Sequence, residues 1–284
     1  MNGYRLSDFC KRVIARTILV WALPFVFIAH AYAGESGERQ AVSGERIEVS
    51  GERIEAKGER IGLTYNASAE VHASYLWRGL YAGGPSLQVS ADVGYGGAYF
   101  TAWFNVGASD IRFTKFQPEL DLLLGFKRWG LNVFLLYIHN FDCGFFDFNN
   151  HVGRGNRFEI DASYTISDRI PLRFLWATRL SAADGYVNAK GDTVFAYSSY
   201  AEVSYTWRLP DNWSIYTAVG VAPWRSCYTG YERNWALQNI ELRLRKDFDV
   251  APRCGMMLQG QVAVSPMNAL QPINLNITYG VYLK

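Results

Sequence analysis

The sequence has few cysteines, a modest share of charged residues and no long hydrophobic run after its first 33 residues. Four cysteines in 284 residues exclude a disulfide-rich scaffold. Hydrophobic residues make up 49% of the chain and aromatic residues 15%, which is too many for a disordered protein. A membrane-spanning helix needs about 18 consecutive apolar residues, and stretches such as 131–138 are about half as long. We therefore expect no helical membrane spans in the mature chain.

Residues 1–33 have the three parts of a secretory signal peptide. Basic residues come first, an apolar run follows at 17–29, and Ala31-Tyr32-Ala33 forms a small-residue cleavage site before Gly34. A short membrane anchor is the alternative, but the run is short for a span. Removing residues 1–33 leaves 24 basic and 25 acidic residues, a net charge of −1. The mature chain is not basic, so we expect no nucleic-acid partner.

Residues 34–63 contain four consecutive seven-residue repeats that begin at positions 36, 43, 50 and 57, each with a Gly-Glu-Arg core. Their apolar positions are spaced by two and five residues, and each repeat contains glycine. This is not the spacing of a coiled coil. We expect a flexible, charged periplasmic arm; the alternative is a segment that binds the cell wall or a partner protein.

From residue 64 to the end of the chain, hydrophobic and polar residues alternate. In the last segment, for example, Ile273, Leu275 and Ile277 alternate with Asn274 and Asn276. A period of two predicts strands with one apolar and one polar face. Twelve strands are predicted, at 64–78, 86–95, 98–106, 116–127, 131–140, 157–166, 171–180, 196–208, 213–223, 235–246, 255–264 and 273–283.

The connections between these strands alternate between short and long. Short turns and long loops at opposite ends, with an even number of strands, are typical of outer-membrane barrels. Aromatic residues near both ends predict two interfacial belts. The long-loop belt is Tyr75, Trp77, Tyr137, Tyr197, Trp224 and Trp235, and the short-turn belt is Tyr95, Phe126, Trp129, Tyr164, Trp207, Trp213 and Tyr282.

Residues 64–284 are therefore predicted to form an all-β fold, a transmembrane antiparallel up-and-down β-barrel of about twelve strands. Its expected location is the bacterial outer membrane, with membrane lipid as its partner. A soluble lipocalin-type barrel or sandwich is the alternative, and its apolar residues would fill the interior instead of facing outward.

Several short motifs are similar to those of the TorF (Gcw-chp) family of outer-membrane porins. They are Tyr75-Leu-Trp-Arg-Gly79, Gly84-Pro-Ser-Leu-Gln88, the Gly96-Gly97 turn with Ala102-Trp103, Glu119-Leu-Asp121 and Tyr200-Ala-Glu202. The resemblance covers most of residues 64–284 and implies a secreted outer-membrane barrel with a proposed transport function. The repeats in residues 34–63 depart from the family pattern.

If the apolar faces meet lipid, charged residues line the interior. The predicted lumen-lining residues are Glu70, Asp92, Glu119, Asp121, Arg157, Glu159, Asp161, Arg173, Arg179, Glu202, Glu241, Arg243 and Arg245. On one interpretation, opposite charges pair across strands and hold the wall together. On the other, they form a selectivity lining for a small polar solute, and the arginines favour anions.

No catalytic residue, cofactor or metal is predicted. His72 has Glu70 and Ser74 two residues away on either side, an alignment that imitates a catalytic triad, but a lone histidine among polar residues is more often simply hydrogen-bonded. The loop at 141–156 carries Asp142, Asp147, Asn149 and Asn150 without the ordered spacing of a calcium loop. The aromatic residues of that loop, Phe145, Phe146 and Phe148, are candidates for a constriction.

Three cysteines remain after signal cleavage, and none forms a CxxC motif. Cys143 and Cys227 fall in predicted long loops, whereas Cys254 falls at the short-turn end. Only Cys143 and Cys227 can then form a disulfide. Taken together, the sequence predicts a porin-like channel for small polar solutes; the alternative is a structural or adhesion protein whose lumen is sealed by charge pairs.

Overall fold

A computed structural model describes residues 62–109, 112, 115–148, 155–180, 184–268 and 271–283. The predicted signal peptide and nearly all of the predicted arm lie outside these residues. Within the described ranges, no helix has the length and apolar character needed to cross a membrane.

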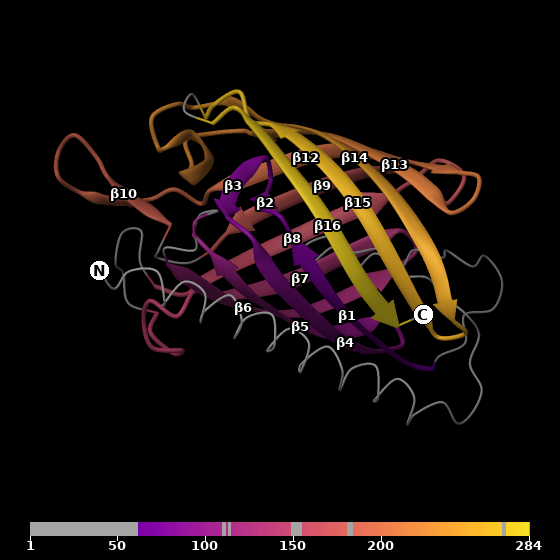
Figure 1. The fold of residues 1–284 in the computed structure, drawn as a ribbon. Coiled ribbons are helices and arrows are strands. Elements are labelled where there is room, and N and C mark those ends of the chain that lie inside the picture. Colours follow the sequence, from indigo (N-terminus) through magenta and orange to yellow (C-terminus); the bar gives the residue numbers. More distant parts are fainter. Residues whose placement is uncertain are drawn as a thin grey trace, which may run out of the picture.

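Twelve antiparallel strands form a closed barrel, each paired with its neighbour in the chain, and the last pairs with the first (Figure 1). This confirms the predicted all-β, up-and-down barrel and its strand number. The barrel strands are β1 (Leu63–His72), β4 (Ser86–Tyr95), β5 (Ala98–Ala108), β6 (Phe116–Arg128), β7 (Leu131–His139), β8 (Arg157–Thr165), β9 (Leu172–Arg179), β12 (Ser199–Leu209), β13 (Trp213–Ala222), β14 (Ala236–Ala251), β15 (Cys254–Val264) and β16 (Ile273–Leu283).

On most strands the alternation separates an apolar exterior from a polar interior, although Tyr99, Leu123, Phe134, Leu136 and Ile138 form a buried apolar cluster. On β16, Leu275 and Ile277 are 66% and 63% exposed. Asn276, which lies between them, is 4% exposed, and Thr278, which follows Ile277, is 0% exposed. A soluble barrel has the opposite arrangement, with its apolar residues inside. The structure therefore has the inverted arrangement expected of a barrel that faces lipid.

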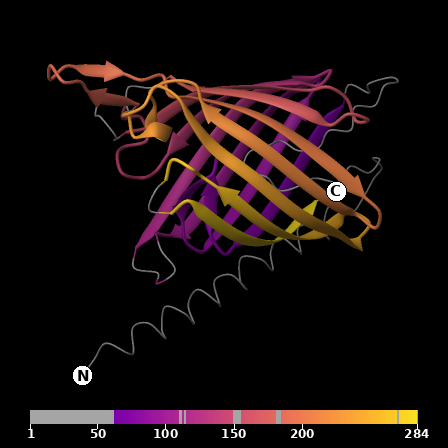
Figure 2. The same cartoon turned by 90° about the horizontal axis from the view of Figure 1, so that it is seen from above.

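Tight turns join the strands at one end. Gly96 and Gly97 form a two-residue hairpin between β4 and β5, and both have positive φ, as the hairpin turn that matches strand twist requires. Longer connections lie at the other end. They carry the hairpin β10 (Gly185–Val187) and β11 (Thr193–Phe195), which projects away from the barrel, and the short 3-10 helix η1 (Cys227–Thr229) (Figure 2).

Two strand boundaries differ from the prediction by five residues or more. The first barrel strand ends at His72 instead of residue 78, and the chain then forms a separate hairpin from β2 (Tyr75–Trp77) and β3 (Leu80–Gly83). Strand β14 continues to Ala251, five residues beyond its predicted end, because it stays paired with β15. The connection predicted between residues 246 and 255 is therefore a tight turn between Ala251 and Cys254.

The aromatic belts are confirmed in most positions and wrong in four. Tyr197 and Trp235 at the long-loop end are exposed, as are Tyr95, Trp129 and the other predicted residues at the short-turn end except Tyr282. Tyr75, Tyr137 and Tyr282 are instead buried, and Trp77 belongs to the inner hairpin. These four side chains cannot contribute to an exterior belt.

Candidate functional site

The first long connection turns into the barrel rather than out of it. Residues 75–83, the inserted hairpin, place Leu76, Trp77 and Arg78 among the inner-face side chains of the barrel, and Figure 1 shows β2 and β3 near the long-loop end. At its tip, the carbonyl of Gly79 accepts a hydrogen bond from Asn274 Nδ2 at 3.0 Å, and Gln238 Nε2 donates to the carbonyl of Arg78 at 3.4 Å. Gly79 has φ +80, and a Cβ there would lie 2.9 Å from the Gln238 carbonyl. Glycine permits this close approach to the wall.

Arg78 extends from the tip of the inserted hairpin to the opposite wall. Its guanidinium donates to both carboxylate oxygens of Glu159 on β8, at 2.6 and 3.1 Å, and to Asp161 Oδ2 at 3.1 Å. The side chains of Arg78 and Glu159 are 9% and 0% exposed. A two-pronged arginine–carboxylate pair fixes orientation as well as charge. This pair joins the inserted hairpin to β8.

Aromatic rings surround the same guanidinium. Its carbon lies 4.8 Å from the ring centre of Trp77, 5.0 Å from that of Tyr200 and 6.0 Å from that of Tyr228, which also accepts a hydrogen bond from Arg78. These distances are within the range of cation–π attraction. Burial raises the pKa of the Tyr228 hydroxyl, and the nearby Arg78 opposes that rise. Tyr228 belongs to η1, so a second long loop also contacts the inserted hairpin.

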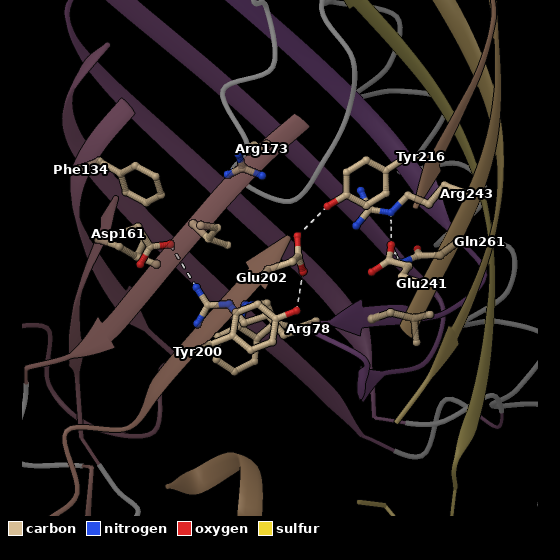
Figure 3. A pocket seen from close by; sticks show the side chains of 14 residues that line it. Arg78, Phe134, Asp161, Arg173, Tyr200, Glu202, Tyr216, Glu241, Arg243 and Gln261 are labelled. Atoms are coloured by element: carbon tan, nitrogen blue, oxygen red, sulfur yellow. Dashed lines mark hydrogen bonds and ion pairs between the residues drawn. The ribbon is translucent and has the colours of Figure 1, made fainter. Parts of the chain in front are cut away.

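A cavity of about 80 Å³ lies beside the inserted hairpin (Figure 3). Arg78 and Asp161 border one side, Glu202 lies in the middle, and Arg243 and Glu241 border the other side. The remaining lining residues are Leu76, Trp77, Phe134, Leu136, Arg173, Leu175, Tyr200, Tyr216 and Gln261. Seven barrel strands and the inserted hairpin thus meet around one space of mixed charge.

None of the thirteen predicted lumen-lining residues is exposed. Eight are buried: Glu70, Asp121, Glu159, Asp161, Arg179, Glu202, Glu241 and Arg245. Five are partly buried: Asp92, Glu119, Arg157, Arg173 and Arg243. The cavity brings together five of the thirteen: Asp161, Arg173, Glu202, Glu241 and Arg243.

Most of the interior arginines lie close to carboxylates. Arg243 donates to Glu241, and Arg245 donates to Asp247 through Nε at 2.9 Å. Arg179 Nε lies 3.7 Å from Glu159 Oε2. Pairing of this kind cancels much of the positive field that a row of unpaired arginines would create. The geometry favours charge pairing over an anion-selective lining, but Arg243–Glu241 and Arg245–Asp247 pair within β14, and of these three pairs only Arg179–Glu159 joins two strands.

His72 does not form a catalytic pair with Ser74. Its Nε2 contacts Glu70 Oε2 at 3.1 Å, and its Nδ1 lies 3.1 Å from both Asn276 Nδ2 and Thr278 Oγ1. The Ser74 hydroxyl donates to the backbone carbonyl of Leu275. A nucleophile needs its base within hydrogen-bonding reach, and here the hydroxyl is directed elsewhere.

The remaining predicted sites lie in the loops. Cys143 and Cys227 are free thiols, so the predicted bridge is not formed in this structure. Phe146 is 81% exposed, and Phe145 and Phe148 pack on Tyr137. None of these three phenylalanines lines the cavity, which the inserted hairpin borders. Among the described residues no group of three or more His, Cys, Asp or Glu could hold a metal ion, and Asn149 and Asn150 lie outside them.

Nine of the fourteen cavity residues were not among the predicted lumen-lining residues, and three of the nine are polar residues on barrel strands: Tyr200, Tyr216 and Gln261. Each lies on the inner face of its strand. Tyr200 precedes Glu202 by two residues, so the period-two rule placed it on the same face. The two-residue period was thus enough to predict an inward-facing Tyr200. The contacts of Tyr216 and Gln261 with Glu202 and Glu241 depend instead on strand register.

The fold and its interior define the class: a closed twelve-stranded β-barrel with an apolar exterior and many buried charged residues. The chain matches no family model and no curated protein, so the TorF resemblance stays a prediction. Similar solved structures include the NanC porin, with TM-score 0.44, 12% identity, and coverage of 78% of this chain and 100% of that chain.

Two further solved structures have the same kind of likeness. An outer-membrane channel from Pseudomonas putida F1 has a TM-score of 0.46 and 9% identity, over 82% of this chain and 98% of that chain. A triple mutant of the Rhodopseudomonas blastica porin has a TM-score of 0.32 and 10% identity, over 79% and 99% of the two chains.

Proposed function

We propose that the chain is an outer-membrane β-barrel that passes small polar solutes through a lumen narrowed by the inserted hairpin. One observation carries the proposal: the barrel is closed, apolar outside and charged inside. Apolar side chains over the whole exterior are unfavourable in water and favourable in lipid. Secretion through the predicted signal peptide would deliver such a barrel to the outer membrane.

The interior supports transport of small solutes only. Barrels of about eight strands are filled by side chains, and those of about sixteen leave a wide aqueous channel. Twelve strands lie between these limits, and the inserted hairpin occupies part of the space. The remaining cavity of about 80 Å³ is bordered by charged and amide groups that suit polar solutes.

Reconstitution in planar bilayers tests this function. The purified barrel should give discrete current steps. Arg243→Gln should shift the reversal potential toward cation preference, because Glu241 loses its partner and the lumen becomes more negative. Arg208→Gln is the matched control, since Arg208 is an exposed arginine paired with Asp168 outside the cavity. Folded protein that inserts and never conducts would refute a channel.

A second candidate is a structural or adhesion protein with a sealed lumen. It is favoured by the paired interior charges and by the projecting hairpin β10–β11 at the long-loop end. This candidate predicts a barrel that migrates faster on SDS gels before boiling than after it, yet carries no current in the bilayer.

A further inference from the structure

Glu202 differs from the other two carboxylates that border the cavity. Asp161 is paired with Arg78, and Glu241 with Arg243. Glu202 accepts hydrogen bonds from two phenols, from Tyr216 at 2.7 Å and from Tyr200. In the part of the chain that the structure describes, Glu202 makes no ion pair.

A buried carboxylate without a counter-ion is costly. Glu202 is only 7% exposed, so little water reaches it. Phenol groups satisfy its lone pairs but are neutral, and the cation that attracts it electrostatically, Arg243, is hydrogen-bonded to Glu241 instead. Buried charges in proteins are usually paired with an opposite charge because desolvation is expensive. The part of the cavity around Glu202 therefore favours a positively charged ligand.

The space in front of Glu202 has the size and the surfaces for a small organic cation. A single water needs roughly 10–15 Å³ of such volume, so about 80 Å³ holds on the order of five to eight non-hydrogen atoms. Rings of Trp77, Phe134 and Tyr216 line the same cavity. Aromatic faces attract ammonium groups, most strongly where water is excluded.

A positive group also borders the cavity on the neighbouring strand. Arg173 on β9 pairs in register with Ser204 on β12, two residues from Glu202 and on the same inner face. A solute that carries both an ammonium and a carboxylate could use Glu202 and Arg173 at once. Gln261 adds an amide on the far side.

We propose that this cavity binds a small solute through its ammonium group, with Glu202 as the counter-ion and the hydroxyls of Tyr200 and Tyr216 holding the Glu202 carboxylate in place. The inference names the solute class for the proposed channel, and it rests on that function only for the claim that the bound solute is transported. Simple ammonium ions and zwitterions share the chemistry that Glu202 recognises.

Calorimetric titration of the folded, detergent-solubilised barrel tests the site with three probes: ethylammonium chloride, glycine and sodium acetate. Ethylammonium and glycine should bind and acetate should not. Glu202→Gln should weaken ethylammonium binding by about tenfold or more. Asp168→Asn, which removes an exposed carboxylate outside the cavity, should leave binding unchanged. Glycine binding more tightly than ethylammonium would identify the ligand as a zwitterion that also uses Arg173.

Unchanged ethylammonium affinity in Glu202→Gln would overturn the proposal, as would tighter binding of acetate than of ethylammonium. If Glu202→Gln does not fold, Tyr216→Phe removes one hydrogen bond to Glu202 and should weaken binding to a smaller extent; an unchanged affinity there would overturn the proposal equally. Binding in solution is independent of conduction. A barrel that binds ethylammonium but carries no current refutes the channel alone, and one that conducts without binding refutes this site alone.

Discussion

Replacing Arg78 with alanine should release the inserted hairpin from the barrel wall. The substitution removes the two-pronged pair with Glu159 and the bond to Asp161, and it leaves the fully buried Glu159 with Arg179 at 3.7 Å. Breaking a buried ion pair by removing one partner costs about 3–5 kcal/mol. At the lower end, about 3 kcal/mol shifts the equilibrium between seated and detached hairpin about a hundredfold.

Single-channel recording measures the outcome. Arg78→Ala should show a larger conductance, or a larger open fraction, than the wild type. The conductance of Arg78→Lys should fall between these two values, because lysine keeps the positive charge but lacks the planar guanidinium that makes two parallel hydrogen bonds. Arg245→Ala is the matched control: it removes an arginine that is also buried and paired, with Asp247, but that does not contact the inserted hairpin. Equal currents in the wild type and Arg78→Ala would refute the assignment of the hairpin as the constriction.

Two further predictions, one on stability and one on thiol reactivity, follow from the packing of buried side chains. Gly220→Ala should lower the free energy of unfolding by about 1–3 kcal/mol, since a Cβ there would lie 2.0 Å from the Tyr200 hydroxyl; Gly260→Ala, with nothing within 4 Å, is the control in denaturant unfolding. Burial raises the pKa of the Cys227 thiol despite the nearby Arg179. Alkylation of Cys227 should therefore be slow at neutral pH and accelerate only when the pH rises above the usual pKa of a thiol. Fast labelling at pH 7 would contradict this.

The sequence was sufficient for the architecture because most barrel strands repeat the same two-residue period, although β7 carries apolar residues on both faces. That period gave the strand number, the pairing of neighbours and the inner position of residues such as Asp121 and Glu241. It also continued through Asp247 and Phe248, where β14 does extend. The early end assigned to that strand ignored a signal that was present.

The inserted hairpin was not predictable from the same rule. Tyr75 and Trp77 continue the alternation of β1, so a local pattern extends the strand to residue 78. What turns the chain inward is a set of distant contacts, among them Arg78 with Glu159 and Gly79 with Asn274. The cavity depends in addition on the register of seven strands. No short-range signal carries that information.

The inserted hairpin also has a consequence for the order of assembly. It lies near the start of the barrel sequence, but its partners come much later: Glu159 is 81 residues further along the chain and Asn274 is 195 residues further. Contacts of such long range form late, after the intervening loop entropy has been overcome. The hairpin can take its final place only when β16 has joined β1. We therefore expect the seating of Arg78 against Glu159 to be among the last steps of folding.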